Sequence, residues 1–579
     1  MKKQWQILRP DIHTVDKLCK ILKCHPAIAS ILVNRNIVSA EDASNFLYPS
    51  LNRLNPPFFI KDMDTAVNRI LTAIKHNEKI LIFGDYDVDG ITATTILLEF
   101  FRSAGADVSY YIPHRTKEGY GLQSNHISDY SLSKRINLII TTDCGSGSHD
   151  AVKAAKAAGI DVIITDHHII SDTIPPAVAV VNPKRHDCPS GFDDLAGVGV
   201  AFYLLICLRK KLREIHFWQN RPEPNLKSLC DLVALGTLAD MVPLVAENRI
   251  LSRTGLDIIT SSNRPGLNAL IEASGINKND VDTDDMVFGL APRLNSAGRI
   301  DHASIAVELL TTKNVETAEQ IAQSLNHMNQ KRRSIENGML AQIEGQLKKN
   351  PHLLQKNTLV LAHQDLHLGV LGIVAARIMQ KYFRPVVLIS TTAGIGKGSA
   401  RSIPGVDLYK GLLACADDLE NFGGHSMAAG IKIKTEKLAR FQTNFENAIG
   451  KMTKPDDFIP KIFIDYELDF DDITGALIDE IESLKPFGSG NHEPLFMSRN
   501  VKVASSKIVG KNHRRMLLKQ ASGSTGKTFN AIHFNIDPSI PLKEHFDQIA
   551  FRLRWNRWNE KKSAQLIIEE VKHDDFVKS

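Results

Sequence analysis

Residues 79–90 read KILIFGDYDVDG. The uninterrupted apolar run in this stretch predicts a short strand that is buried on both faces, as in a parallel sheet. Asp85, Asp87 and Asp89 follow the run at alternate positions. Carboxylates this dense repel one another unless a cation lies among them. The stretch therefore predicts an α/β fold with a metal site at the carboxyl end of its first strand, where α/β proteins place their sites.

Two other structures compete for this acidic motif. A calcium loop of the D-x-D-x-D-G type needs glutamate at its twelfth position and a helix before it. Here the twelfth residue is Ile96, and a strand precedes the motif. A solvated acidic turn would bind no metal, and it would not explain why similar residues follow other apolar segments.

Carboxylates and histidines recur at the ends of further apolar segments. Asp143 follows residues 138–142, and Asp166-His167-His168 follows residues 162–165. Asp240 ends the run 235–240, which we interpret as another strand. Because parallel strands end along one edge of a sheet, these side chains are expected to converge. Oxygen-rich ligation with imidazoles suits Mn²⁺ or Mg²⁺, and the number of carboxylates favours two ions that share a ligand.

The remaining pattern predicts a multidomain α/β protein. Strands and helices alternate from residue 79 to about 165, and long helices without Pro cover 302–349. A second α/β pattern begins near 358, and short strands after 460 predict a small terminal β-barrel. These changes predict an N-terminal helical and loop segment (1–60), a parallel-sheet domain (61–301), connecting helices (302–350), a second α/β domain (351–455) and the barrel (456–579).

Composition excludes several classes of protein. Hydrophobic residues make up 43% of the 579 and charged residues 23%, which is typical of globular domains. There is no run of about 18 apolar residues to cross a membrane, and no apolar signal-peptide core near the N-terminus. The seven cysteines are scattered without a C-x-x-C pair, so we expect a reduced, cytoplasmic protein without structural zinc.

Positive charge is concentrated at the C-terminal end. The net charge is +5, yet residues 499–579 contain 16 Lys and Arg against 8 Asp and Glu. Such a module fits contact with a nucleic-acid backbone, although a solvated basic face explains the charge equally well. Arginines mixed with aromatic residues favour strand tracking and base stacking, and the candidates are Arg514, Arg515, Arg552, Arg554, Arg557, Phe534, Trp555 and Trp558.

Taken together, these motifs resemble the DHH phosphoesterase superfamily and, within it, the RecJ family of bacterial single-stranded-DNA-specific 5′→3′ exonucleases. The resemblance covers roughly residues 40–570. It implies a DHH domain, a DHHA1 domain joined to it by a long helix, and a C-terminal OB-fold. Beyond the acidic motifs, the similar segments are residues 112–115, 118–122, 236–244, 292–299, 367–375, 398–402, 423–430 and 486–491.

The resemblance also implies a role for each motif residue. Asp143 would bridge the two ions, and Asp85 and His168 would act in catalysis. His168 would orient the scissile phosphate or protonate the leaving oxygen, or it would only support a ligand. No serine or cysteine nucleophile is needed where metal ions activate a water. The implied metal ligands are Asp87, Asp89, Asp143, His167 and Asp240.

A second set of residues is implied to hold the nucleic acid. Arg115 and Arg299 are candidates for binding backbone phosphates and Tyr120 for stacking on a base. For Arg115 and Tyr120, plain packing is the alternative. Ser399 and Arg401, which we place in a glycine-flanked loop, look like a pocket for a terminal 5′-phosphate together with His425.

The expected function is metal-dependent 5′→3′ hydrolysis of single-stranded DNA, in DNA repair and recombination by family resemblance. We expect a monomer, with a single-strand-binding protein and a helicase as partners by the same resemblance. One alternative is another DHH phosphoesterase acting on pyrophosphate, short oligonucleotides or cyclic dinucleotides, which would not need the basic barrel. The other is a non-catalytic single-strand-binding protein, which would not need the carboxylates and histidines.

Overall fold

The computed structural model describes residues 3–170, 173–364, 366–521, 526–558 and 561–573. The chain forms two compact units. The first comprises Asn55–Val242 and Thr254–Pro460, and the second comprises Lys3–Leu54, Pro243–Arg253 and Lys461–Ser579. Over the described residues, every helix is too short or too polar to span a membrane.

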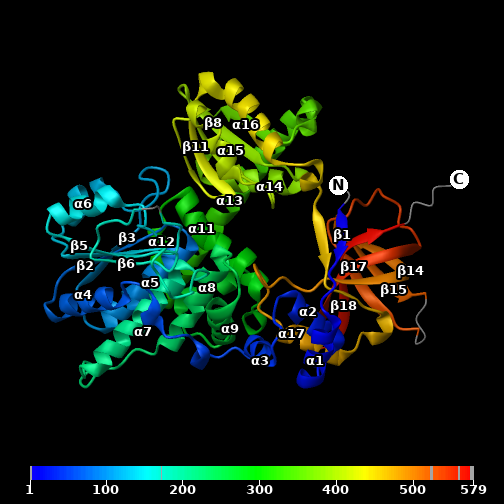
Figure 1. Cartoon of the computed structure of the whole chain (residues 1–579), viewed down its shortest axis with the longest axis horizontal. Coiled ribbons are helices and arrows are strands. Elements are labelled where there is room, and N and C mark those ends of the chain that lie inside the picture. Colours follow the sequence, from blue (N-terminus) through cyan, green and yellow to red (C-terminus); the bar gives the residue numbers. More distant parts are fainter. Residues whose placement is uncertain (1–2, 171–172, 365, 522–525, 559–560, 574–579) are drawn as a thin grey trace. The chain divides into compact units, whose positions relative to one another are not determined.

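A five-stranded parallel sheet forms the first half of the first unit (Figure 1). The strand order is β3-β2-β4-β5-β6, so the chain moves outward from β2 to β3 and then returns to the other side of β2. In α/β sheets, ligands bind at the carboxyl ends of the strands where the strand order reverses, which here is between β2 and β4. The strands are β2 (Ile80–Gly84), β3 (Val108–Tyr111), β4 (Leu138–Thr142), β5 (Asp161–Thr165) and β6 (Ala179–Val181).

Helices cover both faces of this sheet, which explains why its strands are apolar without interruption. α5 (Val88–Ser103) contacts β2 and β3, and α7 (Gly197–Glu214) contacts β4 and β5. α4 (Met63–Lys75) contacts β6, and α6 (His149–Ala157) joins the core on the face of Leu81 and Phe83. α5 begins inside the acidic motif because Asp87 caps it, accepting a 3.1 Å hydrogen bond from the Gly90 amide.

The interpretation of residues 235–240 as a strand is wrong. They form the end of α8 (Cys230–Asp240), and Asp240 is its last residue. α8 packs against α5 and α7, so it is buried nearly all round and its sequence shows no amphipathic period. A short apolar run does not distinguish a buried strand from a buried helix.

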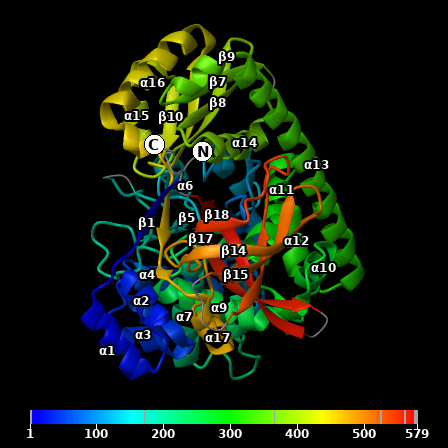
Figure 2. The ribbon, with the colours of Figure 1, turned by 90° about the vertical axis from the view of Figure 1, so that its right-hand side faces the viewer.

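A helical region connects the first sheet to a second one. Its longest member is α13 (Val315–Lys349), 35 residues long, which contacts α10, α11 and α12 and then α14 (Figure 2). This confirms the expected long connecting helix. The helices before it are α9 (Ala246–Ile259), α10 (Pro265–Ala273), α11 (Ala291–Ile300) and α12 (Ser304–Thr311).

The second sheet of the first unit is mixed. Its order is β10-β11-β9-β8-β7, and only β7 and β8 are parallel. The helices with it are α14 (Leu368–Tyr382), α15 (Leu408–Leu413) and α16 (Leu438–Met452). The strands are β7 (Leu359–Gln364), β8 (Val386–Thr392), β9 (Ile395–Arg401), β10 (Asn421–Gly424) and β11 (Ala428–Lys434).

Ser399 and Arg401 therefore lie on an inner strand, β9, and the expected glycine-flanked loop is wrong. The glycines in this stretch serve close packing between strands. A Cβ on Gly398 would lie 2.6 Å from Ile431 Cγ1 and 3.1 Å from Ile389 Cγ1. His425 comes directly after β10.

The second unit is built around a closed five-stranded barrel. β14 pairs with β15 on one side and with β17 on the other, which closes the sheet β14-β15-β16-β18-β17. Phe496 and Phe551 lie in its core. The elements are β12 (Lys461–Ile464), β13 (Tyr466–Glu467), α17 (Gly475–Ser483), β14 (Phe496–Val509), β15 (His513–Gln520), β16 (Thr528–His533), β17 (His545–Trp558) and β18 (Lys561–Lys572).

The N-terminal segment belongs to this barrel unit. Its helices are α1 (Ile12–Leu22), α2 (Pro26–Asn34) and α3 (Ala40–Leu47), and Leu18 and Ile28 lie in the barrel's hydrophobic core. The segment also contains a strand that the sequence does not predict. β1 (Gln4–Ile7) pairs in parallel with β12, more than 450 residues later in the chain, and no local pattern signals such a partner.

Candidate metal centre

The predicted carboxylates and histidines meet at the carboxyl ends of β2, β4 and β5. Asp85 and Asp87 follow β2, Asp143 follows β4, and His167 follows β5. Asp143, the first residue after β4, has φ near 60°, in the left-handed region, and its side chain is 2% exposed. The remaining ligand candidates come from helices: Asp89 from the first turn of α5 and Asp240 from the end of α8.

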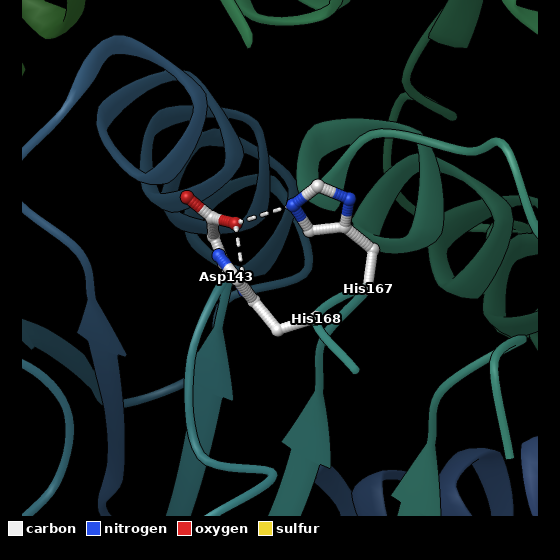
Figure 3. A group of neighbouring side chains, drawn as sticks. All are labelled: Asp143, His167 and His168. Carbon is white, nitrogen blue, oxygen red and sulfur yellow. Dashed lines mark ion pairs between the residues drawn. The ribbon is translucent and has the colours of Figure 1, made fainter. Parts of the chain in front are cut away.

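Three groups of side chains hold possible ligand atoms within 4.8 Å of one another: Asp89 with His167 and Asp240, Asp85 with Asp87 and Asp143, and Asp143 with His167 and His168. Figure 3 shows the Asp143 carboxylate facing the His167 ring, with Asp143 Oδ1 3.2 Å from His167 Nε2. His167 Nε2 also lies 3.6 Å from Asp240 Oδ2 and 3.8 Å from Asp89 Oδ2. Asp143 and His167 therefore lie at the middle of the cluster.

The electrostatics of the cluster fit bound cations. Burial and the charge of Asp87 raise the pKa of Asp89 to about 7, and burial with the charges of Asp89 and Asp87 raises the pKa of Asp240 to about 9. Burial and neighbouring carboxylates also raise the pKa of Asp85 and of Asp143 well above the ordinary value. A divalent ion would remove this mutual repulsion.

Unpartnered buried atoms point to the same ligand. Among the described residues, Asp85 Oδ1, Asp143 Oδ1 and both ring nitrogens of His167 are buried without a hydrogen-bond partner. Such atoms are costly in a folded protein unless something else binds them. Burial and the charge of His168 lower the pKa of His167 to about 3, so the ring is neutral and can offer a lone pair to a metal.

Asp89 is held by the start of α7. Its Oδ2 accepts a 2.7 Å hydrogen bond from the Gly197 amide, and its Oδ1 accepts a 2.8 Å bond from the Val198 amide. The N-terminus of a helix favours negative charge because its first amides have no partner within the helix. α7 thus fixes the position of this carboxylate in the cluster.

Asp166 orients His168. Asp166 Oδ1 lies 2.8 Å from His168 Nδ1 and accepts from the His167 and His168 amides, while Oδ2 accepts from the Ser146 amide. Burial alone would lower the pKa of His168, but the hydrogen bond and charge of Asp166 raise it to about 9. His168 is therefore a cationic ring whose Nδ1 is occupied, and Nε2 remains for a substrate.

A cluster of arginines adjoins the carboxylates. Arg299, at the end of α11, donates a 2.8 Å hydrogen bond to the Gly369 carbonyl. Burial and the charges of Arg115, Arg332 and Arg401 lower the pKa of Arg299 to about 9. Arg115 lies over the Tyr86 ring, 4.6 Å from its centroid. Guanidinium groups that crowd one another in this way form a site for an anion.

The remaining predicted residues lie around these clusters. Arg401 Nη1 donates to Ser399 Oγ at 3.1 Å. The Tyr120 hydroxyl donates to the Asp143 carbonyl at 3.2 Å and lies 3.1 Å from His168 Nδ1, while the residue is 47% exposed. The His425 ring lies 6.4 Å from the His168 ring, nearly parallel to it. The structure thus brings together every predicted site residue of the first unit.

Two cationic residues near the centre were missed by the sequence reasoning. Lys184 comes just after β6 and acts electrostatically on Asp240 and His167. Its position at a strand end is the same signal that identified Asp143, and the sequence reasoning did not apply it to the fifth strand. Arg332 lies within α13, where a helical pattern gives no sign that it approaches Arg299.

In the barrel, much of the expected basic surface is engaged internally. Arg552 pairs with Glu493 and with Glu569, and Arg554 pairs with Glu493. These arginines stabilise the barrel instead of standing free for a phosphate backbone. Arg514 is 9% exposed and donates to the Ile540 carbonyl, and Trp555 Nε1 donates to Asp479. Arg515, Arg557 and Phe534 are exposed, and the side chain of Trp558 lies outside the described residues.

Comparison with known proteins matches all three predicted domains. The DHH family N-terminal domain matches residues 79–237, the DHHA1 domain matches 355–451, and the RecJ OB domain matches 464–570. The chain is 36% identical over 578 residues to the single-stranded-DNA-specific exonuclease RecJ of Bacillus subtilis, covering 98% of this chain and 71% of that protein. It is 34% identical over 595 residues to the Escherichia coli protein of the same name, covering 99% of this chain and all of the relative.

Solved structures agree. RecJ from Thermus thermophilus in complex with Mn²⁺ superposes with a TM-score of 0.83 at 27% identity, covering 98% of this chain and 79% of that one. The same protein in complex with Mg²⁺ gives a TM-score of 0.77 at 26% identity, covering 98% and 78%. These findings confirm the resemblance and the fold class that the motifs predict. The chain therefore belongs to the RecJ family of single-stranded-DNA-specific exonucleases.

Proposed function

We propose that this protein is a metal-dependent exonuclease that removes nucleotides from the 5′ end of single-stranded DNA. One observation carries the proposal: a buried cluster of carboxylates and histidines lies directly beside a cluster of arginines. The first is suited to cations and the second to phosphates, so together they fit a phosphodiester held at a metal centre. The names of the relatives support the substrate, and the 5′→3′ direction rests on the family resemblance alone.

The metal ions are proposed to be Mn²⁺ or Mg²⁺. Oxygen-rich donors with an imidazole suit these hard cations, and the relative from Thermus thermophilus was solved with each of them. Asp89, His167 and Asp240 would hold one ion, and Asp85, Asp87 and Asp143 the other, so Asp85 joins the ligands. Ions held by these residues would activate a water for attack on the phosphodiester and would offset charge on the reacting phosphate.

The protein groups around the centre prepare the substrate. The orientation of the Asp89 carboxylate is restrained, because two backbone amides of α7 donate hydrogen bonds to its two oxygens. Asp166 holds His168 with Nδ1 bound, so the protonated Nε2 is proposed to bind a phosphate oxygen or to give its proton to the leaving oxygen. The Tyr120 hydroxyl donates a hydrogen bond to the backbone carbonyl of Asp143. The partly exposed Tyr120 ring is proposed to stack on a base of the strand.

The arginine cluster is proposed to recognise the strand end, and Arg401→Ala tests this. A terminal phosphate carries more negative charge than an internal diester, so a positioned guanidinium favours ends. We expect kcat/KM on a 5′-phosphorylated strand to fall about tenfold, and on a 5′-hydroxyl strand much less. Equal losses on both substrates at fixed salt would show that Arg401 grips internal phosphates or supports β9.

One experiment tests the function as a whole. End-labelled single strands, duplex DNA, RNA, pyrophosphate and cyclic dinucleotides are each incubated with Mn²⁺, Mg²⁺ or a chelator. We expect mononucleotides to be released from the single strand only in the presence of metal, and the release to begin at the 5′ end. Preferred hydrolysis of pyrophosphate or cyclic dinucleotides would favour another DHH phosphoesterase. Binding without hydrolysis would favour a single-strand-binding protein.

The cellular setting is also a proposal. All seven cysteines are free in the structure, which fits the reduced cytoplasm. A role in DNA repair and recombination, a monomeric state, and partnership with a single-strand-binding protein and a helicase rest on the family resemblance. Pull-down of these partners from cell extract with and without nuclease treatment would separate direct contact from a shared DNA strand.

A further inference from the structure

Arg115 and Tyr120 lie on the same loop, which follows β3 and ends where the next helical segment begins at His126. Gly119 and Gly121, on either side of Tyr120, have φ values of 89° and 77°. Both values are in the left-handed region, where the glycine backbone turns without strain. Because its two neighbours have this freedom, the backbone at Tyr120 depends on contacts elsewhere in the loop for its position.

The side chain of Glu118 joins this loop to the core of the first sheet. Its Oε2 accepts a 2.9 Å hydrogen bond from the Tyr111 hydroxyl and lies 3.1 Å from His126 Nε2. Tyr111 is the last residue of β3, and its ring stacks on Phe83 of β2 with 5.6 Å between the centroids. His126 is 5% exposed, and its ring lies 5.0 Å from the Phe83 ring. One carboxylate thus links the loop to two rings that pack against β2.

The hydrogen bonds around Glu118 also determine which nitrogen of His126 carries the proton. The Gln123 amide lies 3.0 Å from His126 Nδ1, and an amide N–H can only donate, so Nδ1 is the acceptor. The proton is therefore on Nε2, which donates it to Glu118. The backbone of Glu118 is engaged too, since its carbonyl accepts from Gln123 Nε2 at 2.7 Å and its amide donates to the His114 carbonyl at 2.9 Å. Glu118 is thus held by both its side chain and its backbone.

The tip of the loop lies at the metal centre. Two residues after Glu118, the Tyr120 hydroxyl donates to the Asp143 carbonyl at 3.2 Å and lies 3.1 Å from His168 Nδ1. The Tyr120 ring lies edge-on to the Tyr86 ring, with 6.5 Å between the centroids. A shift of Glu118 would change the direction in which the Tyr120 ring faces, because the glycines beside it do not resist the change.

We propose that Glu118 is a positioning residue for strand binding, which holds the Tyr120 loop so that the ring is oriented to stack on a base. This inference rests on the proposed function and names the residue that prepares the base contact before a strand arrives. A loop that is already ordered loses less conformational entropy on binding than a loop that the strand must order. Loss of Glu118 should therefore weaken strand binding through the base contact, while the metal ligands, which other elements hold, keep their places.

Strands that lack one base test this inference. Glu118→Ala is combined with single strands in which one nucleotide, at each position in turn, is abasic, and binding is measured in chelator, which stops hydrolysis. In the wild type, removal of the base that stacks on Tyr120 should weaken binding about tenfold. In Glu118→Ala the same removal should weaken binding less than about twofold, because the ring no longer meets the base. Glu118→Ala should bind the intact strand about fivefold more weakly than the wild type does.

Two variants of His126 separate its contact with Glu118 from the packing of its ring. A glutamine at this position places its amide nitrogen near the site of Nε2, so His126→Gln should keep the hydrogen bond to Glu118. An asparagine reproduces the acceptor Nδ1 instead, so His126→Asn leaves Glu118 with Tyr111 alone. His126→Asn should therefore show a smaller abasic response than His126→Gln.

Further controls distinguish positioning from folding. Glu118→Gln keeps an acceptor for Tyr111 and His126, so this variant should retain most of the abasic response. Glu214→Ala removes a carboxylate of α7 that pairs with Lys211 at 3.1 Å, and it should leave both the affinity and the abasic response unchanged. Calorimetry with Mn²⁺ should give Glu118→Ala the metal affinity of the wild type.

Three results would overturn the inference. An abasic response in Glu118→Ala as large as that of the wild type would show that Tyr120 is positioned without Glu118. A wild type with no abasic response at any position would have no base contact for Glu118 to prepare. Loss of Mn²⁺ binding in Glu118→Ala would make the residue a support of the metal centre. Failure of the proposed function reads out separately, because wild-type protein with Mn²⁺ would then leave the unmodified strand intact.

Discussion

Asp143→Asn is expected to abolish hydrolysis of single-stranded DNA, lowering kcat by at least about 1,000-fold with saturating Mn²⁺. Asp143 is the carboxylate that two of the three ligand groups share, and it is 2% exposed. The amide keeps the size of the side chain but removes its charge. The metal centre therefore loses a carboxylate that lies both beside Asp85 and Asp87 and beside the two histidines. Binding of the strand should survive, because the arginines are untouched.

The measurement pairs single-turnover kinetics with Mn²⁺ calorimetry. Asp150→Asn is a matched control, since Asp150 has the same chemistry on the same domain but its side chain is 90% exposed and pairs with the exposed Lys153. It should keep wild-type activity. If Asp143→Asn turned over at the wild-type rate in saturating Mn²⁺, Asp143 would not be a ligand, and the assignment of the two groups would have to be abandoned.

Gly197→Ala is expected to lower activity about 100-fold without unfolding the protein. A Cβ on Gly197 would lie 2.7 Å from Asp143 Oδ1 and 2.8 Å from Asp143 Cβ, so the carboxylate or the start of α7 must move. The same residue donates its amide to Asp89, so any shift displaces a second carboxylate. One methyl group therefore disturbs both groups of ligands, and Mn²⁺ affinity should fall with activity.

Gly199→Ala provides the control on the same helix. Its Cβ would lie 3.0 Å from Leu195 Cδ2, the far end of a flexible side chain. Gly197 and Gly199 both lie in the first turn of α7, so the two substitutions are expected to change helix propensity in a similar way. Thermal unfolding should be similar for the two variants, and activity should differ strongly. Equal activity in both would mean that the close approach of Gly197 to Asp143 has no role in placing the metal ligands.

The strands of the first sheet could be predicted because they are local signals. Residues 138–142 are aliphatic or β-branched and fully buried, and they form β4 over the whole predicted range. Asp240 could not be placed in the same way. A buried helix such as α8 has the same uninterrupted apolar sequence as a buried strand, so the sequence pattern does not distinguish them. Ser399 and Arg401 were placed in a loop because glycine also marks turns, whereas here it makes room between packed strands.

The sequence by itself determined the chemistry of the centre. Carboxylates and histidines at the ends of successive apolar segments identified most of the cluster, since parallel strands necessarily end along one edge. The resemblance carried by the further motifs then identified the family. These signals are local, because each depends on a residue and the few residues before it.

Only the tertiary structure decided how these groups are held and which others join them. The amides of α7 fix Asp89 across more than 100 residues of chain, and Asp166 fixes His168. Arg332 and Lys184 reach the centre from a connecting helix and from the edge of the sheet. β1 finds its partner β12 at the far end of the chain. All these contacts have the same physical reason. Burial, close approach and charge coupling depend on distance in space, and the order of residues along the chain does not determine that distance directly.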